Sequence, residues 1–407
     1  MRRYLFSIVL AIFTIGGIGF SYLYGAVNHL PDYKLVTVVG DEQAATNIEL
    51  SGAYYLGVYS SHLSVNEKGS QYSIENNSFR QQILNDRVWY SGRAGINELV
   101  INYKGFMRGK SNVNGLYADD EWIIYVDSEN RQGSNGRYNV NLYVTTLNKK
   151  TELVQEYDYD LADRGFFTIR DVQLLDDHIN IIAAEQGLSN DESYLYSYIV
   201  DVELGSLDSF ERLIVGEPQI IDEHNMQAIQ VRVSAIVETS PTIPSDYIVL
   251  TEVKTKSMEQ GELNQDSPSQ TSYYGYSYRT EEVFQLPVEP YDNSISQLIH
   301  NVFTYVEYDK EKIIVSRYAL DTKEFKPQYI TFTAEELGLA DITRSKRLED
   351  NYLYIFDGTM ATPTVVAIDL SKGELVYRGQ VIYDGDEQEA EKQMAQLHLN
   401  NINIKLE

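Results

Sequence analysis

The chain has 407 residues, of which 60 are acidic and 33 basic, so its formal net charge is -27. Hydrophobic residues make up 43% of the chain, which is enough for a core and excludes disorder of the whole chain. The negative charge repels phosphate backbones, so nucleic acid is not expected as a partner. Cysteine is absent, which excludes disulfides, thiolate metal sites and a catalytic thiol.

Residues 4–27 form a predicted transmembrane anchor. The stretch from Tyr4 to Tyr24 carries no formal charge and is dominated by Leu, Ile, Val and Phe. As a helix it would extend over about 30 Å, which matches the hydrocarbon core of a bilayer. The sequence therefore predicts a single-pass protein that contacts membrane lipid through this segment.

Arg2 and Arg3 precede the apolar segment, so the positive-inside rule places residues 1–3 in the cytoplasm and the bulk of the chain outside it. The alternative is a signal peptide whose removal would leave a secreted protein. The best cleavage position follows Ala26, but the bulky Tyr24 stands where a small residue is preferred. An uncleaved signal-anchor in the cell membrane is the favoured interpretation.

Residues 28–44 are predicted to be a tether, and residues 45–383 to form an extracytoplasmic all-β domain. This region is rich in Tyr, Val, Ile, Leu and Thr, in short runs that are separated by Asp, Asn and Gly. Such composition is typical of strands joined by turns. Residues 257–272 are polar and of low complexity, so we expect a flexible insertion there.

A repeated piece recurs along the β domain: a strand, a polar turn and a second apolar run. It is clearest in LYVTTLNKKTELV from Leu142, IVSRYALDTKEFKPQYITF from Ile314 and VVAIDLSKGELVYRG from Val365. The markers of the polar turns recur about every 50 residues, which is near the length of one four-stranded propeller blade. The seven markers are Asn66, Asn102, Asn148, Asp201, Lys254, Asp321 and Asp369.

A second, acidic marker precedes an apolar strand in several repeats. Asp and Asn favour tight turns because their side chains bond to the nearby backbone. In an up-and-down sheet of four strands the first and third turns fall at the same edge, so both markers are expected there. The acidic markers are Asn85-Asp86, Asp119-Asp120, Asp176-Asp177 and Glu349-Asp350.

These repeats resemble bacterial membrane-anchored β-propeller proteins in general, over about residues 45–383. The resemblance implies a propeller of about seven four-stranded blades, with six or eight as alternatives. It points to no particular repeat family, because no WD dipeptide is present. Tandem β-sandwiches are the alternative fold. Residues 384–407 are predicted to form a C-terminal helix, capped by an Asp, and a tail.

The sequence nominates no catalytic residue and no metal or cofactor site. None of the six histidines shows zinc-ligand spacing, and no P-loop, nucleophile elbow or dinucleotide motif occurs. The pairs Asp119-Asp120 and Asp176-Asp177 could line a cation-binding rim, but their turn role explains them. The stretch from Val126 to Arg137 is predicted to be a hairpin loop rather than a calcium loop. Tyr274, Tyr276 and Tyr278 are expected to pack against neighbouring strands.

The anchor and the lack of a catalytic motif favour a binding or sensory module that engages an envelope protein or a ligand through a propeller face. The alternative is an extracytoplasmic hydrolase or lyase with a site at the central channel of the propeller, since propellers host enzymes but do not themselves confer activity. The sequence leaves open whether the chain is an enzyme.

Overall fold

The computed structural model describes residues 14, 16, 17, 30–40, 46–57, 59–73, 96–133, 137–187, 193–216, 219–222, 227–236, 244–257, 270–289, 293–349 and 351–404. Across these ranges no helix is long and apolar enough to cross a membrane. The predicted anchor, residues 4–27, lies outside the described residues except for positions 14, 16 and 17, so the anchor stays a prediction.

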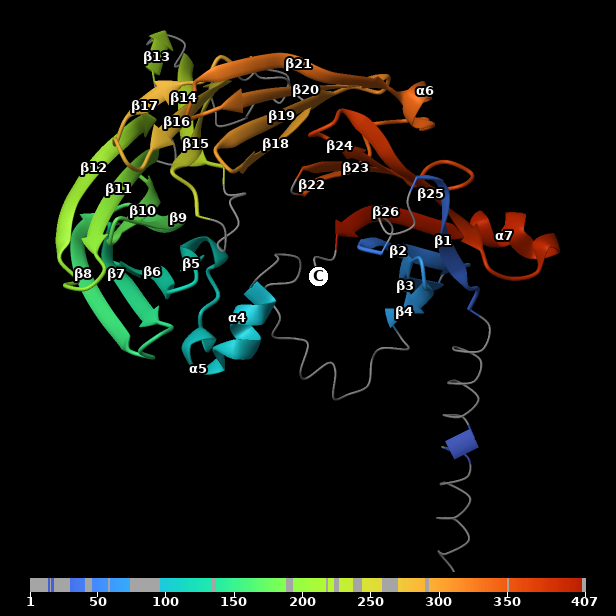
Figure 1. The fold of residues 1–407 in the computed structure, drawn as a ribbon, viewed down its shortest axis with the longest axis horizontal. Helices are drawn as coiled ribbons and strands as arrows, with labels where there is room; N and C mark the ends of the chain where they lie inside the picture. The colour runs from blue at the N-terminus through green and yellow to red at the C-terminus, as the bar shows by residue number, and fades with distance from the viewer. Residues whose placement is uncertain are drawn as a thin grey trace, which may run out of the picture. The chain divides into compact units, whose positions relative to one another are not determined.

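The described part of the chain confirms the all-β fold. It forms six antiparallel sheets, four of them with four strands and two with five (Figure 1). The sequence predicted about seven units with six as an alternative, and one of its seven markers, Asn102, lies in no sheet, while Lys254 belongs to a sheet but not to a turn. Asn102 ends a helix, and Lys254 lies inside a long strand.

The chain divides into two compact units. Unit 1 comprises Met1–Trp89, Lys310–Lys312 and Phe332–Glu407, and unit 2 comprises Tyr90–Asp309 and Ile313–Thr331. Unit 2 contains four sheets, and in each of them consecutive strands are neighbours. The strands are β5 (Leu116–Ala118), β6 (Trp122–Gln132), β7 (Tyr138–Asn148) and β8 (Val154–Arg164); β9 (Phe166–Leu175), β10 (His178–Gln186), β11 (Ser193–Asp201) and β12 (Leu207–Gly216); β13 (Gln219–Asp222), β14 (Gln227–Ala235), β15 (Tyr247–Ser257), β16 (Gln270–Ser277) and β17 (Val283–Gln285); and β18 (Ser294–Ile299), β19 (Val302–Tyr308), β20 (Lys312–Ala319) and β21 (Glu324–Thr333).

Each sheet of unit 2 shares a hydrophobic core with the next sheet along the chain. Ile181 of β10 packs with residues of the β5–β8 sheet, such as Val144, on one face of its own sheet. Ile182, on the opposite face, packs with residues of the β13–β17 sheet, such as Leu250. A sheet in a two-layer sandwich buries one face, whereas this sheet buries both. This arrangement disfavours the sandwich alternative for unit 2.

A short helical segment precedes the first strand of unit 2, where the marker Asn102 predicted a strand followed by a polar turn. It comprises α4 (Ile96–Asn102), α5 (Lys104–Met107) and the 3-10 turn η2 (Val113–Gly115). The prediction was wrong because Ile96 and Leu99 are three residues apart, which places them on one face of α4, and Met107 of α5 lies in the same hydrophobic cluster. All three are buried against β5 and β6.

Unit 1 contains two sheets, and strands from both ends of the chain complete them. The sheet order is β26-β2-β3-β4 in one and β1-β25-β24-β23-β22 in the other. The elements are β1 (Tyr33–Gly40), β2 (Ile48–Leu56), β3 (Tyr59–Asn66), β4 (Gly69–Tyr72), α6 (Ala334–Leu337), β22 (Ser345–Glu349), β23 (Tyr352–Asp357), β24 (Thr364–Asp369), β25 (Glu374–Tyr383), η3 (Glu387–Glu389), α7 (Ala390–Met394) and β26 (Leu397–Ile404).

Both chain ends depart from the sequence prediction. The predicted tether, residues 28–44, contains β1, in which Tyr33 and Leu35 alternate with exposed residues and enter the core. The predicted C-terminal helix is present as η3 and α7, and Asp386 caps it by accepting a hydrogen bond from Gln388 N. The predicted tail beyond the helix contains β26, which pairs with β2. The core of unit 1 therefore depends on both chain ends.

Candidate functional site

Most of the polar markers that the sequence identified occupy turns, as predicted. The acceptor oxygen of the side chain bonds to backbone N–H groups one to three residues ahead, which closes each turn between the third and fourth strands. Five of the seven markers do so: Asn66, Asn148, Asp201, Asp321 and Asp369.

The acidic markers occupy the first turns of their sheets where the structure describes them. Asp119 Oδ1 accepts hydrogen bonds from the backbone of Glu121 and Trp122. Asp176 and Asp177 both have positive φ, 47° and 66°, as the two-residue hairpin turn between β9 and β10 requires. Residues 85, 86 and 350 of the other predicted markers lie outside the described residues.

First and third turns meet at one edge of the β9–β12 sheet. Val202 N donates a hydrogen bond of 3.0 Å to the carbonyl oxygen of Asp177, which ties the third turn to the first. We call residues 176–178 and 201–208 the β9–β12 turn edge. The predicted coincidence of the two markers at one edge is confirmed for this sheet.

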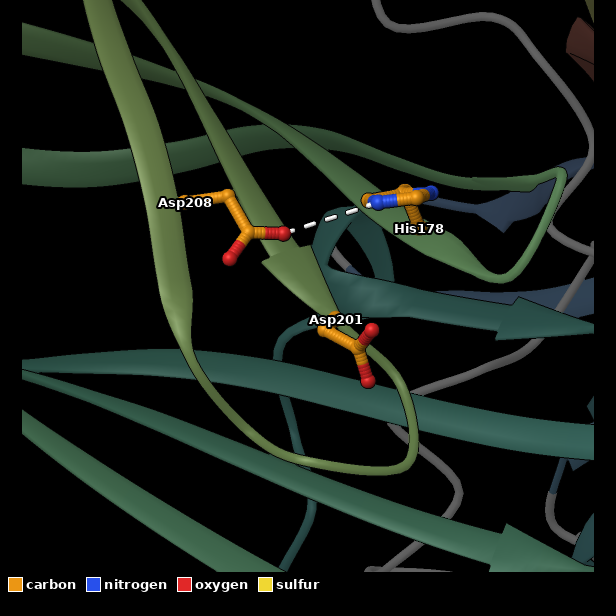
Figure 2. A group of neighbouring side chains, drawn as sticks. All are labelled: His178, Asp201 and Asp208. Atoms are coloured by element: carbon orange, nitrogen blue, oxygen red, sulfur yellow. Dashed lines mark ion pairs between the residues drawn. The ribbon is translucent and has the colours of Figure 1, made fainter.

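Three side chains of the β9–β12 turn edge converge, as Figure 2 shows: His178, Asp201 and Asp208. One possible ligand atom from each lies within 4.8 Å of the other two. His178 Nε2 and Asp208 Oδ2 lie 3.5 Å apart. The side chains of His178 and Asp208 are 45% and 40% exposed, so solvent and ligands can reach them.

The strand register explains why these side chains meet. His178 is the first residue of β10 and Asp201 the last residue of β11, and the two are direct partners across the ladder. Directly opposed side chains of antiparallel strands have Cβ atoms about 5 Å apart. Asp208 is the second residue of β12, which pairs with β11 on its other side.

A hydrogen bond holds each of the three side chains in place. His178 Nδ1 lies 2.7 Å from the carbonyl oxygen of Asp176, which can only accept, so Nδ1 carries the hydrogen. Asp201 Oδ1 accepts hydrogen bonds from the backbone of its turn. Asp208 Oδ1 accepts a hydrogen bond of 2.7 Å from Ser206 Oγ. His178 Nε2 and Asp208 Oδ2 face each other within the cluster.

The cluster allows two kinds of chemistry. With hydrogen on Nδ1, neutral His178 directs the lone pair of Nε2 toward a carboxylate oxygen of Asp208. Both atoms are then hydrogen-bond acceptors, so they repel each other. A proton on Nε2 resolves this conflict and gives an ion pair. A divalent cation bound by all three side chains resolves it as well.

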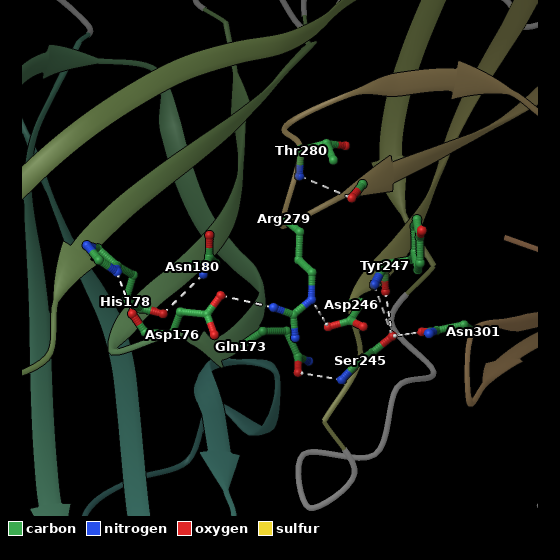
Figure 3. Close-up of polar contacts among 11 residues, drawn as sticks. Gln173, Asp176, His178, Asn180, Ser245, Asp246, Tyr247, Arg279, Thr280 and Asn301 are labelled. Carbon is green, nitrogen blue, oxygen red and sulfur yellow. Dashed lines mark hydrogen bonds and ion pairs between the residues drawn. The ribbon is translucent and has the colours of Figure 1, made fainter. Parts of the chain in front are cut away.

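A polar network supports the turn beneath His178, as Figure 3 shows. Arg279, in the turn after β16, donates from Nη1 to Asp176 Oδ2 and from Nε to Asp246 Oδ1, both at 2.9 Å. Asp176 therefore bonds Arg279 through its side chain and His178 through its carbonyl group. The network links the β9–β12 sheet to the β13–β17 sheet within unit 2.

A buried polar group continues this link into the interior. Tyr278 donates its hydroxyl hydrogen to Asp171 Oδ2, and Gln173 Nε2 donates to the same carboxylate. Gln173 Oε1 accepts a hydrogen bond of 3.0 Å from Ser245 N. Burial, together with the Asp171 carboxylate, raises the pKa of Tyr278 well above its ordinary value. These groups satisfy one another and have a structural role.

Other sequence candidates lie away from this cluster. Tyr276 and Tyr278 are buried in the core between the β9–β12 and β13–β17 sheets, so the predicted packing role is confirmed. The stretch after Val126 is part of a hairpin, as predicted, but residues 126–132 were wrongly expected to be loop, because β6 extends to Gln132. His398 packs edge-on against Tyr55 in unit 1.

Sequence reasoning did not bring His178, Asp201 and Asp208 together. It placed Asp201 in a third turn and treated His178 as one of six unrelated histidines, and it did not single out Asp208. The sequence did contain a usable signal. If Asp176-Asp177 is a two-residue turn, residue 178 begins the strand after it, and Asp201 ends the strand after that. Antiparallel pairing of these two strands places residue 178 opposite residue 201.

No protein-family model matches the chain, and no curated protein matches it. Solved structures that it resembles include an acylaminoacyl peptidase from Pyrococcus horikoshii (TM-score 0.33, 10% identity, 66% of this chain and 40% of that chain). Another is an oligogalacturonate lyase in complex with manganese (TM-score 0.30, 8% identity, 65% and 64%). A third is a Synechocystis apocarotenoid oxygenase (TM-score 0.32, 8% identity, 64% and 58%). The chain spans less than two thirds of each, and at these TM-scores the likeness carries no functional information.

Proposed function

We propose that the chain is a binding module of the cell envelope, which engages a protein partner through the β9–β12 turn edge. The observation that carries the proposal is the set of accessible charged side chains held at this edge, together with Arg279, which bonds to Asp176 from the neighbouring sheet. His178, Asp208 and Arg279 are 40–49% exposed, and backbone or side-chain hydrogen bonds fix each of them. Charges of both signs that are already ordered favour specific docking, because little conformational entropy remains to be lost.

The proposed location is the outer side of the cell membrane, with the N-terminus in the cytoplasm. Its support is the uncharged apolar segment of residues 4–27 and the two arginines before it. In spheroplasts, an added protease should digest a C-terminally tagged chain, and the tag should sediment with membranes. Recovery of the tagged chain as soluble cytosolic material would overturn this part of the proposal.

We also propose that the six sheets are blades of one propeller. The support is local: the sheets are up-and-down meanders, and those of unit 2 share cores in chain order. Each sheet of unit 1 pairs strands from the N-terminal part of the chain with strands from the C-terminal part. Such pairing would close a ring of blades.

Site-specific photocrosslinking in membranes tests the proposed partner surface. A photoreactive residue at Glu203, which is exposed in the β9–β12 turn edge, should give one defined adduct, and the same probe at the exposed Glu324 of β21 should not give it. Arg279→Glu should abolish the adduct, whereas Lys326→Glu should leave it unchanged. Adducts that form equally at both probe positions, or that persist in Arg279→Glu, would contradict the proposal.

A hydrolase or lyase is the second candidate function, and the proximity of one imidazole to two carboxylates favours it. His178 with Asp208 could transfer a proton to or from a glycan or peptide substrate. Turnover of such a substrate by the full-length chain, lost in His178→Gln, would support this candidate. Activity that His178→Gln retains would place any catalysis elsewhere.

A further inference from the structure

We infer that His178, Asp201 and Asp208 bind one divalent first-row transition-metal ion, with Zn²⁺ as the preferred occupant. The inference deepens the proposed function and rests on the same β9–β12 turn edge. It adds a ligand class: a metal ion that would shape this surface and offer open coordination positions to a partner.

The donor positions fit a single ion. Zinc ligands lie about 2.0–2.2 Å from the metal, so neighbouring donor atoms in one coordination shell are about 3–3.5 Å apart. His178 Nε2 and Asp208 Oδ2 already have this separation, at 3.5 Å. All three donors lie within 4.8 Å of one another, so small rotations of the Asp201 and Asp208 side chains would complete the shell.

The orientation of His178 is the one that metal-binding histidines adopt. Nδ1–H donates to the carbonyl oxygen of Asp176, which leaves Nε2 as the ligand atom directed at the cluster. Metal-ligating histidines almost always use the second ring nitrogen in this way, because the bond fixes the tautomer and the ring plane. Asp176 in turn is held by Arg279, from the neighbouring sheet.

Charge and donor type select the class of ion. Two carboxylates and a neutral imidazole carry two negative charges, which one divalent ion balances. Imidazole is a poor ligand for Ca²⁺ and Mg²⁺ and a good one for first-row transition metals, of which Zn²⁺ binds more tightly than Mn²⁺ at a given site. The exposure of His178 and Asp208 leaves room for water or a partner's side chain in the remaining positions.

The direct test is titration of the full-length protein, purified in detergent and freed of metal, with Zn²⁺ alone. Calorimetry should show one equivalent bound. His178→Gln and Asp208→Asn should each weaken binding by about tenfold or more, since even outer-shell changes cost that much at metal sites.

Two matched variants separate the site from general charge effects. Glu211→Gln removes one exposed carboxylate from the same strand as Asp208, and His300→Gln removes a histidine from the first turn of the β18–β21 sheet. Both should bind Zn²⁺ as the wild type does. Absence of stoichiometric binding in the wild type, or equal affinities in all variants, would overturn the inference.

A measurement on the wild type alone covers the case in which a variant fails to fold. Diethyl pyrocarbonate modifies accessible imidazoles, and both His178 and His300 are accessible. Zn²⁺ should protect His178 from modification and leave His300 reactive, as judged by peptide mass spectrometry. Equal reactivity of His178 with and without Zn²⁺ would rule the site out. Failure of the photocrosslinking experiment would not affect these results, so the metal site and the partner surface can be judged separately.

Discussion

Arg279 and Asp176 form an ion pair of 2.9 Å across the boundary between two neighbouring sheets of unit 2. Both side chains are well exposed, at 49% and 82%, so solvent screens their attraction. Arg279→Ala should therefore lower the free energy of unfolding by no more than about 1 kcal/mol. Urea denaturation measures the change, and Lys326→Ala, which breaks an ion pair within β21, is the control. A loss several times larger would mean that Arg279 positions the sheets rather than only the turn.

Tyr278→Phe tests the buried network behind this ion pair. The substitution removes the donor to Asp171 and leaves a buried carboxylate with one partner fewer. We expect a loss of about 1–3 kcal/mol in the free energy of unfolding. The control is Tyr159→Phe, whose hydroxyl donates to the carbonyl oxygen of Gly205 in a partly exposed place, where water can replace it. Equal losses in both variants would show that the Asp171 network adds no special stability.

The C-terminal strand offers a third prediction. Ile402 of β26 is 2% exposed in the core of unit 1, whereas its neighbour Asn401 is exposed. Ile402→Ala should cost about 2–5 kcal/mol through lost burial and the cavity that remains. Asn401→Ala should change stability by less than about 0.5 kcal/mol. Thermal and urea denaturation of the two variants would reveal similar stabilities if β26 were dispensable.

Local chemistry made much of the fold predictable. Short runs rich in Tyr, Val, Ile, Leu and Thr marked the strands. Asn148, Asp201 and Asp369 marked turns because short polar side chains bond to the backbone just ahead of them. The segment with Ile96 and Leu99 was misassigned, since a short apolar run fits a strand or a helix until its spacing is compared with the 3.6-residue period.

Long-range pairing was not predictable from local patterns. β1 and β26 bond to strands more than 300 residues away in the sequence, so neither has a local signal beyond alternation. The cluster of His178, Asp201 and Asp208 depends on register as well, because a shift by one residue would turn His178 to the other face of the sheet. Sequence composition can suggest residues that could form a site, but only the pairing of the strands determines which of them lie side by side.

Lys346 of β22 offers a final prediction, on titration. Its half-buried ammonium group donates to the carbonyl oxygens of Ile342 and Arg344, at 2.8 and 2.7 Å. Burial lowers the pKa of Lys346 from 10.5 to about 8, while the Asp341 carboxylate opposes the shift. Because the folded pKa is depressed, the unfolded chain binds the proton more tightly. The contribution of Lys346 to stability is therefore full above the ordinary lysine pKa and is lost as the pH falls through about 8.

The pH dependence of acetylation measures this pKa directly, because only the neutral amine reacts. Lys346 should be acetylated with a midpoint near pH 8, as followed by peptide mass spectrometry. Lys372 is the matched control: it lies in the same sheet's third turn, and its hydrogen bond to Asp369 raises its pKa above the ordinary value. Its reaction should therefore begin only at much higher pH, even though its side chain is 65% exposed. A common midpoint for the two lysines would show that the surroundings of Lys346 do not exclude water enough to favour the neutral amine.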